Sequence, residues 1–147
     1  MLVYRIANER FINELSGKGA ELAGGRWNPK GRPALYASSS LALCICEILV
    51  HSDKDIPPGN MRFAELFVPD KLVSDKYFSK DCLECSVQKG TEWLRENSSL
   101  AIKVPSALLP NNYSKDFNIV INPNHKDMPL IKIQGIYPLE FDARLFK

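Results

Sequence analysis

The sequence lacks the features that mark several large classes of protein. None of its apolar runs approaches the roughly 20 residues that a membrane-spanning helix needs. The N-terminus begins Met1-Leu2-Val3-Tyr4-Arg5, soon turns polar, and does not have the profile of a signal peptide. Internal repeats, low-complexity tracts and linkers are also missing. We therefore expect a cytoplasmic protein that makes no contact with a membrane.

Clusters of basic charge are missing as well. The 19 Lys and Arg residues nearly balance 17 Asp and Glu residues, and they never form a run. This pattern does not support a nucleic-acid-binding surface, so we expect no direct nucleic-acid contact by this chain. The 147 residues, with 45% hydrophobic and 24% charged positions, have the size and composition of one ordinary globular domain.

The four cysteines allow two interpretations. Cys44 and Cys46 are two apart in an apolar stretch, so they point to different faces of a helix. Cys82 and Cys85 have the spacing of a zinc or redox pair. A zinc site would need a second pair or two nearby histidines, and the chain has only two histidines in all. We therefore expect no metal, and reduced, buried structural cysteines, with a redox or zinc pair as the alternative.

The segment Gly24–Gly31 has an unusual composition of glycines, a proline, a cation and a tryptophan. Glycine lets the backbone approach a ligand closely, and the rigid fork of donors on Arg26 suits phosphate or carboxylate. The segment therefore indicates a loop that holds an anionic ligand. The alternative is a packed turn with a buried Trp27 and a solvent-exposed Arg26.

Residues 40–51 are the most apolar segment and predict a buried helix with one charge, Glu47, in its middle. At helical spacing, Ser40, Cys44, Glu47 and His51 share a narrow stripe. A desolvated carboxylate is costly unless it is paired, and such groups gather at functional sites. The alternative is that the stripe faces water and Glu47 pairs with His51 one turn away.

The remaining pattern predicts an α+β domain. Helices are expected at 9–15 and 82–97, a glycine-rich loop at 16–31, and strands at 2–7, 33–37, 61–68, 100–104, 117–121 and 130–136. Few helices and several short strands in mixed order favour a largely antiparallel sheet. We expect one domain that spans residues 1–147.

Several motifs in this order resemble the RES-domain family, which is named for an arginine, a glutamate and a serine. The resemblance covers nearly the whole chain, which looks short for the family. It rests on Tyr4-Arg5, Gly24-Gly25-Arg26-Trp27-Asn28 with Gly31, Leu35-Tyr36-Ala37-Ser38, Glu47 with His51, Val104-Pro105-Ser106-Ala107, Asn118, Asn122-Pro123 with His125, and Phe141-Asp142-Ala143-Arg144-Leu145.

This resemblance implies a toxin of a bacterial toxin–antitoxin pair, with a fold similar to that of ADP-ribosyltransferases. Such toxins use NAD+ as a substrate and need no cofactor. They cleave its nicotinamide–ribose bond or transfer ADP-ribose to a protein. The implied partner is a helix-turn-helix antitoxin of the Xre type that blocks the active-site cleft. The competing interpretation is a non-catalytic module that only binds its antitoxin.

The resemblance also assigns roles to residues. Arg26 would anchor the pyrophosphate with help from Arg5, and the ring of Tyr36 would stack on the nicotinamide. Glu47 would hold the ribose hydroxyls and stabilise the positive charge that develops on the sugar. The other expected NAD contacts are Trp27, Ser38 and Ser106, of which Ser106 would bond the nicotinamide amide or a phosphate; His51 and Asn122 are expected to support the site from behind.

Overall fold

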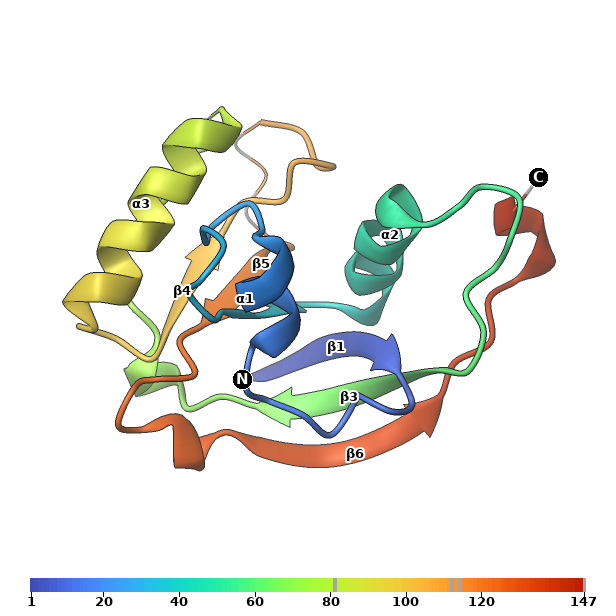
Figure 1. The fold of residues 1–147 in the computed structure, drawn as a ribbon, viewed down its shortest axis with the longest axis horizontal. Helices are drawn as coiled ribbons and strands as arrows, with labels where there is room; N and C mark the ends of the chain where they lie inside the picture. The colour runs from blue at the N-terminus through green and yellow to red at the C-terminus, as the bar shows by residue number, and fades with distance from the viewer. Residues whose placement is uncertain (81, 112, 114, 147) are drawn as a thin grey trace.

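The computed structural model describes residues 1–80, 82–111, 113 and 115–146 (Figure 1). Their centre is a six-stranded sheet with the order β4-β5-β2-β1-β3-β6. The named strands that neighbour one another in it all pair antiparallel. They are β1 (Leu2–Asn8), β2 (Leu35–Ser38), β3 (Met61–Phe67), β4 (Ala101–Val104), β5 (Asn118–Ile121) and β6 (Lys132–Pro138). The predicted single α+β domain with an antiparallel sheet is confirmed.

Helices flank this sheet. They are α1 (Lys18–Ala23), α2 (Leu41–His51) and α3 (Leu83–Glu96), with short 3-10 helices η1 (Asp70–Leu72), η2 (Met128–Leu130) and η3 (Ala143–Phe146). Figure 1 shows α3 at the β4 end of the sheet, whereas α2 lies over β1. Strands β5 and β2 lie between β4 and β1 in the sheet, and α2 contacts β2 as well as β1.

Alternating side chains give the sheet two apolar faces. One core gathers Val3, Leu35, Ala37, Ala64, Leu66, Ile119 and Ile121 from alternate strand positions. The other gathers Ile102, Val104 and Val120 under Trp27 from the glycine-rich segment and Trp93 and Leu94 from α3. The second face also carries Tyr36 and Ser38, since residues two apart on a strand point the same way.

Two local predictions near the N-terminus are wrong. Residues 9–15 form turns and not a helix. The carbonyls of Phe11 and Ile12 accept hydrogen bonds from the guanidinium of Arg5, and the Phe11 carbonyl accepts from the Glu14 amide at 2.9 Å in a turn. The expected loop at 16–31 contains the helix α1, which starts after Gly17 at φ +71°.

The apolar helix α2 is less buried than its composition predicts. Its N-cap is confirmed, because the Ser40 hydroxyl accepts from the Leu43 amide. Within the helix only Leu43 and Cys44 are buried, and Val50 is 58% exposed. The helix rests on β1 and β2 by one face only, so apolar composition overstated its burial.

The cysteines differ from expectation at one pair. Cys44 is buried and Cys46 is exposed, which confirms that they lie on different faces of α2. Cys82 and Cys85 are both exposed, and their sulfur atoms are bonded to each other, so the expectation of buried, reduced thiols is wrong for this pair. In the part of the chain that the structure describes, no helix has the length and apolar character of a membrane span.

Candidate active site

Glu47 lies at the centre of a hydrogen-bonded group of polar side chains. Its Oε1 accepts from the Ser106 hydroxyl at 2.7 Å and from the Asn118 amide at 2.6 Å. The amide oxygen of Asn118 accepts in turn from the Ser38 hydroxyl at 2.7 Å. No described residue is bonded to the second carboxylate oxygen, Oε2. The group therefore fixes the carboxylate through one oxygen and leaves the other for a ligand.

The sheet explains why these residues meet. Asn118 begins β5 and is paired with Ser38 on one side and with Val104 on the other. Ser106 follows β4 directly after Pro105, and its hydroxyl also accepts from the Leu108 amide at 3.1 Å. The ends of β2, β4 and β5 therefore lie together against the helix that carries Glu47. Ser106 is both a turn residue and a donor that positions Glu47.

Arg26 lies at the tip of a tight turn. The Gly25 amide donates to the Asn28 carbonyl at 3.0 Å, which closes the turn around Arg26 and Trp27. The Arg26 side chain is exposed and makes no hydrogen bond or ion pair with the described residues. Its five donors are therefore available to an anion from solution.

Asn28 holds this turn in place. Its buried amide nitrogen donates to three carbonyls, those of Ala20 at 2.8 Å, Arg32 at 2.9 Å and Pro29 at 3.1 Å. Its amide oxygen accepts from the hydroxyl of Tyr36 at 2.7 Å. A buried asparagine with this many partners fixes the backbone on both sides of Arg26.

Tyr36 connects the turn to the sheet. Its hydroxyl donates to Asn28 and accepts from the Trp27 amide at 3.0 Å. Burial raises the pKa of Tyr36 to about 12, and its hydrogen bonds to the turn oppose that rise only in part. The hydroxyl is thus neutral, fully bonded, and engaged in holding the turn.

The Arg26 turn and Glu47 are anchored to the same face of one strand. Tyr36 ties the turn to β2, and Ser38, two residues further along, ties Asn118 and Glu47 to it. Side chains two apart on a strand are separated by roughly 7 Å along it. A carboxylate oxygen without a bond to a described residue and an exposed guanidinium, on elements anchored to one strand, suit a ligand that combines hydroxyl groups with an anionic group.

Trp27 and Arg5 do not join this group. Trp27 is 2% exposed and packs edge-on against Phe78 with ring centroids 5.5 Å apart, so its ring belongs to the second core. Its expected contact with NAD stays a prediction. Arg5 pairs with Ala64 and donates to the carbonyls of Phe11 and Ile12 at 3.2 and 2.9 Å. Burial lowers the pKa of Arg5. Its guanidinium stabilises the turns after β1 and interacts electrostatically with Cys44 of α2, and its expected help to Arg26 stays a prediction.

Neither His51 nor Asn122 is bonded to Glu47 among the contacts of the described residues, so their expected supporting role stays a prediction. His51 is exposed at the end of α2, and Glu47 bonds to Ser106 and Asn118 instead of pairing with it. Asn122 follows the opposite end of β5, where its amide donates to Asn97 at 2.9 Å.

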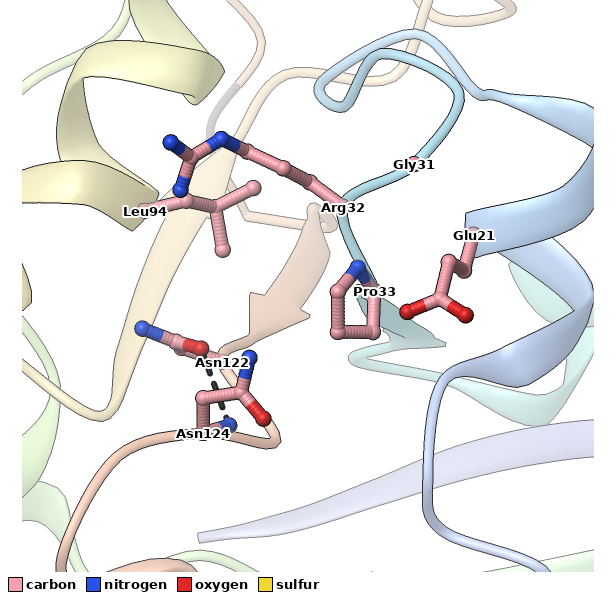
Figure 2. A pocket seen from close by; sticks show the side chains of 7 residues that line it. All are labelled: Glu21, Gly31, Arg32, Pro33, Leu94, Asn122 and Asn124. Atoms are coloured by element: carbon pink, nitrogen blue, oxygen red, sulfur yellow. Dashed lines mark hydrogen bonds between the residues drawn. The ribbon is translucent and has the colours of Figure 1, made fainter.

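A hollow of about 340 Å³ lies beside Asn122, and Figure 2 shows the side chains that line it. The side-chain oxygen of Asn122 accepts from the Asn124 backbone amide at 3.0 Å, and Glu21 lies on the opposite side of the hollow. A second hollow, of about 630 Å³, is lined by Val104, Pro105 and Phe117 beside the Glu47 group. Neither Glu47 nor Arg26 is among the lining residues of either hollow, and only the second hollow has chain neighbours of the Glu47 group, Pro105 and Phe117, in its lining.

Sequence reasoning missed two asparagines of this arrangement. Both Asn28 and Asn118 belong to the motifs of the resemblance, but the sequence analysis assigns neither a role. A usable signal was their setting, since Asn28 sits between a tryptophan and a proline and Asn118 opens an apolar strand. A polar side chain inside apolar surroundings must find a partner.

The protein is an antiparallel α+β domain whose candidate site combines an exposed arginine turn with a glutamate bonded to a serine. A family model described as "RES domain" matches residues 2–142. The chain belongs to the RES-domain family.

Related proteins align with this chain over nearly all of their length. "Toxin Res" of Yersinia enterocolitica is 33% identical, with 99% of both chains covered. The "Prs ADP-ribosylating toxin" of Sphingobium sp. is 30% identical, with 98% and 96% covered. The impression of a short chain is therefore wrong. A chain in the crystal structure of the M. tuberculosis MbcT-MbcA toxin–antitoxin complex shares the fold, with a TM-score of 0.68, 18% identity, and 94% and 83% coverage.

Proposed function

We propose that this RES-family toxin consumes NAD+ by cleaving the bond between nicotinamide and ribose. The observation that carries the proposal is the Glu47 carboxylate, which is fixed through Oε1 by Ser106 and Asn118 while Oε2 makes no bond to a described residue. A carboxylate held rigidly beside a reacting sugar stabilises the positive charge that develops there without reorganisation in the transition state.

The chemistry needs few groups. The glycosidic carbon–nitrogen bond breaks and its electron pair leaves with nicotinamide, which is neutral, so no general acid is required. Oε2 of Glu47 accepts from the ribose hydroxyls and faces the developing oxocarbenium charge. Arg26, exposed at the tip of its turn, pairs with the pyrophosphate. An oxygen of phosphate or water then bonds to the sugar carbon, and water releases one proton.

Ser106 acts on Glu47 in addition to its expected contact with the nicotinamide amide or a phosphate. Its hydroxyl donates a hydrogen bond to Oε1 of Glu47 at 2.7 Å, and its oxygen accepts one from the Leu108 amide. Ser106 is therefore a positioning residue for Glu47, and Tyr36 is a positioning residue for the Arg26 turn.

A second candidate function is transfer of ADP-ribose to a protein. The Sphingobium relative, which matches along almost its whole length, is named as a Prs ADP-ribosylating toxin, and this favours a protein acceptor. The same Glu47 and Arg26 would serve both reactions, since only the acceptor differs. A module that only binds an antitoxin remains the non-catalytic competitor.

The proposed partner is a helix-turn-helix antitoxin of the Xre type that covers this face, in a cytoplasmic setting. The related fold of the M. tuberculosis toxin–antitoxin complex supports the kind of partner.

The test is nicotinamide release from NAD+ by the purified protein, with and without inorganic phosphate, followed by mass analysis of the ADP-ribose product. Release that depends on phosphate, with the sugar phosphate as product, identifies phosphate as acceptor; release without it identifies water. Labelled ADP-ribose on a protein in a cell extract would move the assignment to transfer. Intact NAD+ in every arm, with folded protein, would refute both enzymatic proposals.

A further inference from the structure

We propose that Cys82 and Cys85 form a reversible dithiol–disulfide site that takes its oxidising equivalents from low-molecular-weight disulfides such as glutathione disulfide. The two residues open α3, with Cys82 as N-cap and Cys85 in the first turn. Their Cα atoms are 5.3 Å apart and their sulfur atoms are bonded. Both residues are exposed, so a small disulfide can reach them. This inference does not depend on the proposed reaction with NAD+.

The position of Cys82 favours it as the attacking sulfur. Its Sγ accepts from the Cys85 amide at 3.3 Å, which makes it the cap of the helix. A helix N-terminus stabilises negative charge, and a thiolate is the form that attacks disulfides. Cys85 lies close enough to resolve the intermediate, because its sulfur already contacts that of Cys82.

The exchange balances without any group beyond the small disulfide. The Cys82 thiolate attacks one glutathione sulfur, forms a mixed disulfide and releases the first glutathione. The Cys85 thiolate then attacks the Cys82 sulfur and releases the second. Two protein thiols are oxidised, one glutathione disulfide is reduced, and the two thiol protons end on the two glutathione molecules.

The site lies at the start of the helix whose later part contacts the Arg26 turn. A Cβ atom at Gly90 would lie 1.7 Å from the Trp27 carbonyl oxygen, so helix and turn are in direct backbone contact. Phe78, four residues before Cys82, packs on the ring of Trp27. The bond between the cysteines thus closes the first turn of the helix that supports Trp27. Closing so short a loop is expected to raise Tm by about 5 °C.

The two remaining cysteines provide controls within the same molecule. Cys44 is buried, and burial raises the pKa of its thiol to about 11, so it should stay unmodified in the folded protein. Cys46 is exposed on α2 but has no bonded partner. It should therefore keep glutathione as a mixed disulfide.

The test is equilibration of the full chain in buffers of graded reduced and oxidised glutathione, followed by alkylation and peptide mass analysis. We expect Cys82 and Cys85 to lose both thiols together over one two-electron transition, without bound glutathione, and Tm to rise with it. Cys46→Ser should leave this transition unchanged, and Cys82→Ser with Cys85→Ser should abolish both effects. Free thiols at every ratio, glutathione retained on either cysteine, or a stoichiometric zinc ion removable by chelator would each overturn the proposal.

Discussion

Replacing Gly90 by alanine tests the contact between α3 and the Arg26 turn. The added Cβ would lie 1.7 Å from the Trp27 carbonyl oxygen and 2.6 Å from its carbon, and both obstacles are backbone atoms. Restoring ordinary contact requires helix and turn to separate by roughly 1.5 Å or more. That movement would disturb Trp27, which is buried in the second core, and with it the neighbouring Arg26.

The magnitude follows from two opposing effects. Alanine favours a helix interior over glycine by about 1 kcal/mol, whereas overpacking costs about 1–3 kcal/mol and lies at the upper end when backbone must move. We expect a net loss of about 2 kcal/mol and a fall in Tm of about 4–8 °C for a chain of this size. The rate of nicotinamide release should also fall at temperatures where the variant is still folded, because the Arg26 turn is displaced.

A matched control lies in α1. A Cβ at Gly19 meets no atom within 4 Å, so Gly19→Ala should keep or slightly raise Tm through helix propensity. Thermal unfolding of both variants, followed by circular dichroism, measures the difference. A Tm for Gly90→Ala equal to or above that of the unsubstituted protein would refute the close packing of α3 on the turn.

Three further predictions concern single groups. Arg26→Ala should leave Tm within about 1 °C, since the exposed side chain bonds to no described residue, but should lower kcat/KM for NAD+ by about 100-fold or more in the nicotinamide assay. Ser86→Ala should raise Tm by about 2 °C in calorimetry, because the buried hydroxyl has no hydrogen-bond partner among the described residues; a clear fall in Tm would show a hidden partner. The free energy of unfolding should fall with rising pH between about 9 and 12, because burial raises the pKa of Cys44 to about 11 and of Tyr36 to about 12. The unfolded chain therefore releases these protons at a lower pH than the folded protein. Denaturant titrations of Cys44→Ala should show a shallower fall between about pH 9 and 11.

The sequence was most informative where a local pattern was sufficient. Alternation and apolar spacing located the six strands, α2 and α3, because each of these segments buries one face against the same sheet. The serine N-cap of α2 and the tight turn around Arg26 also follow from short stretches of chain.

The rest depended on contacts between distant residues. The bond between Ser38 and Asn118 joins positions 80 residues apart, so only the strand register reveals that Asn118 reaches Glu47. The segment after β1 has helical spacing, but Arg5 bonds its carbonyls and turns result. The sequence alone allows Trp27 to contact a ligand or to pack in the core. In the structure its side chain packs in the second core, and its carbonyl lies against Gly90 of α3.

The most direct test of the central claim is nicotinamide release by Glu47→Gln. Glutamine keeps an oxygen that accepts from Ser106 and Asn118, so the fold and Tm should be retained while the negative charge is lost. We predict a fall in kcat of about 1,000-fold relative to the unsubstituted protein, in line with the loss of one preorganised electrostatic group. A rate within tenfold of the unsubstituted protein would contradict the assignment of Glu47 as the residue that stabilises the reacting sugar.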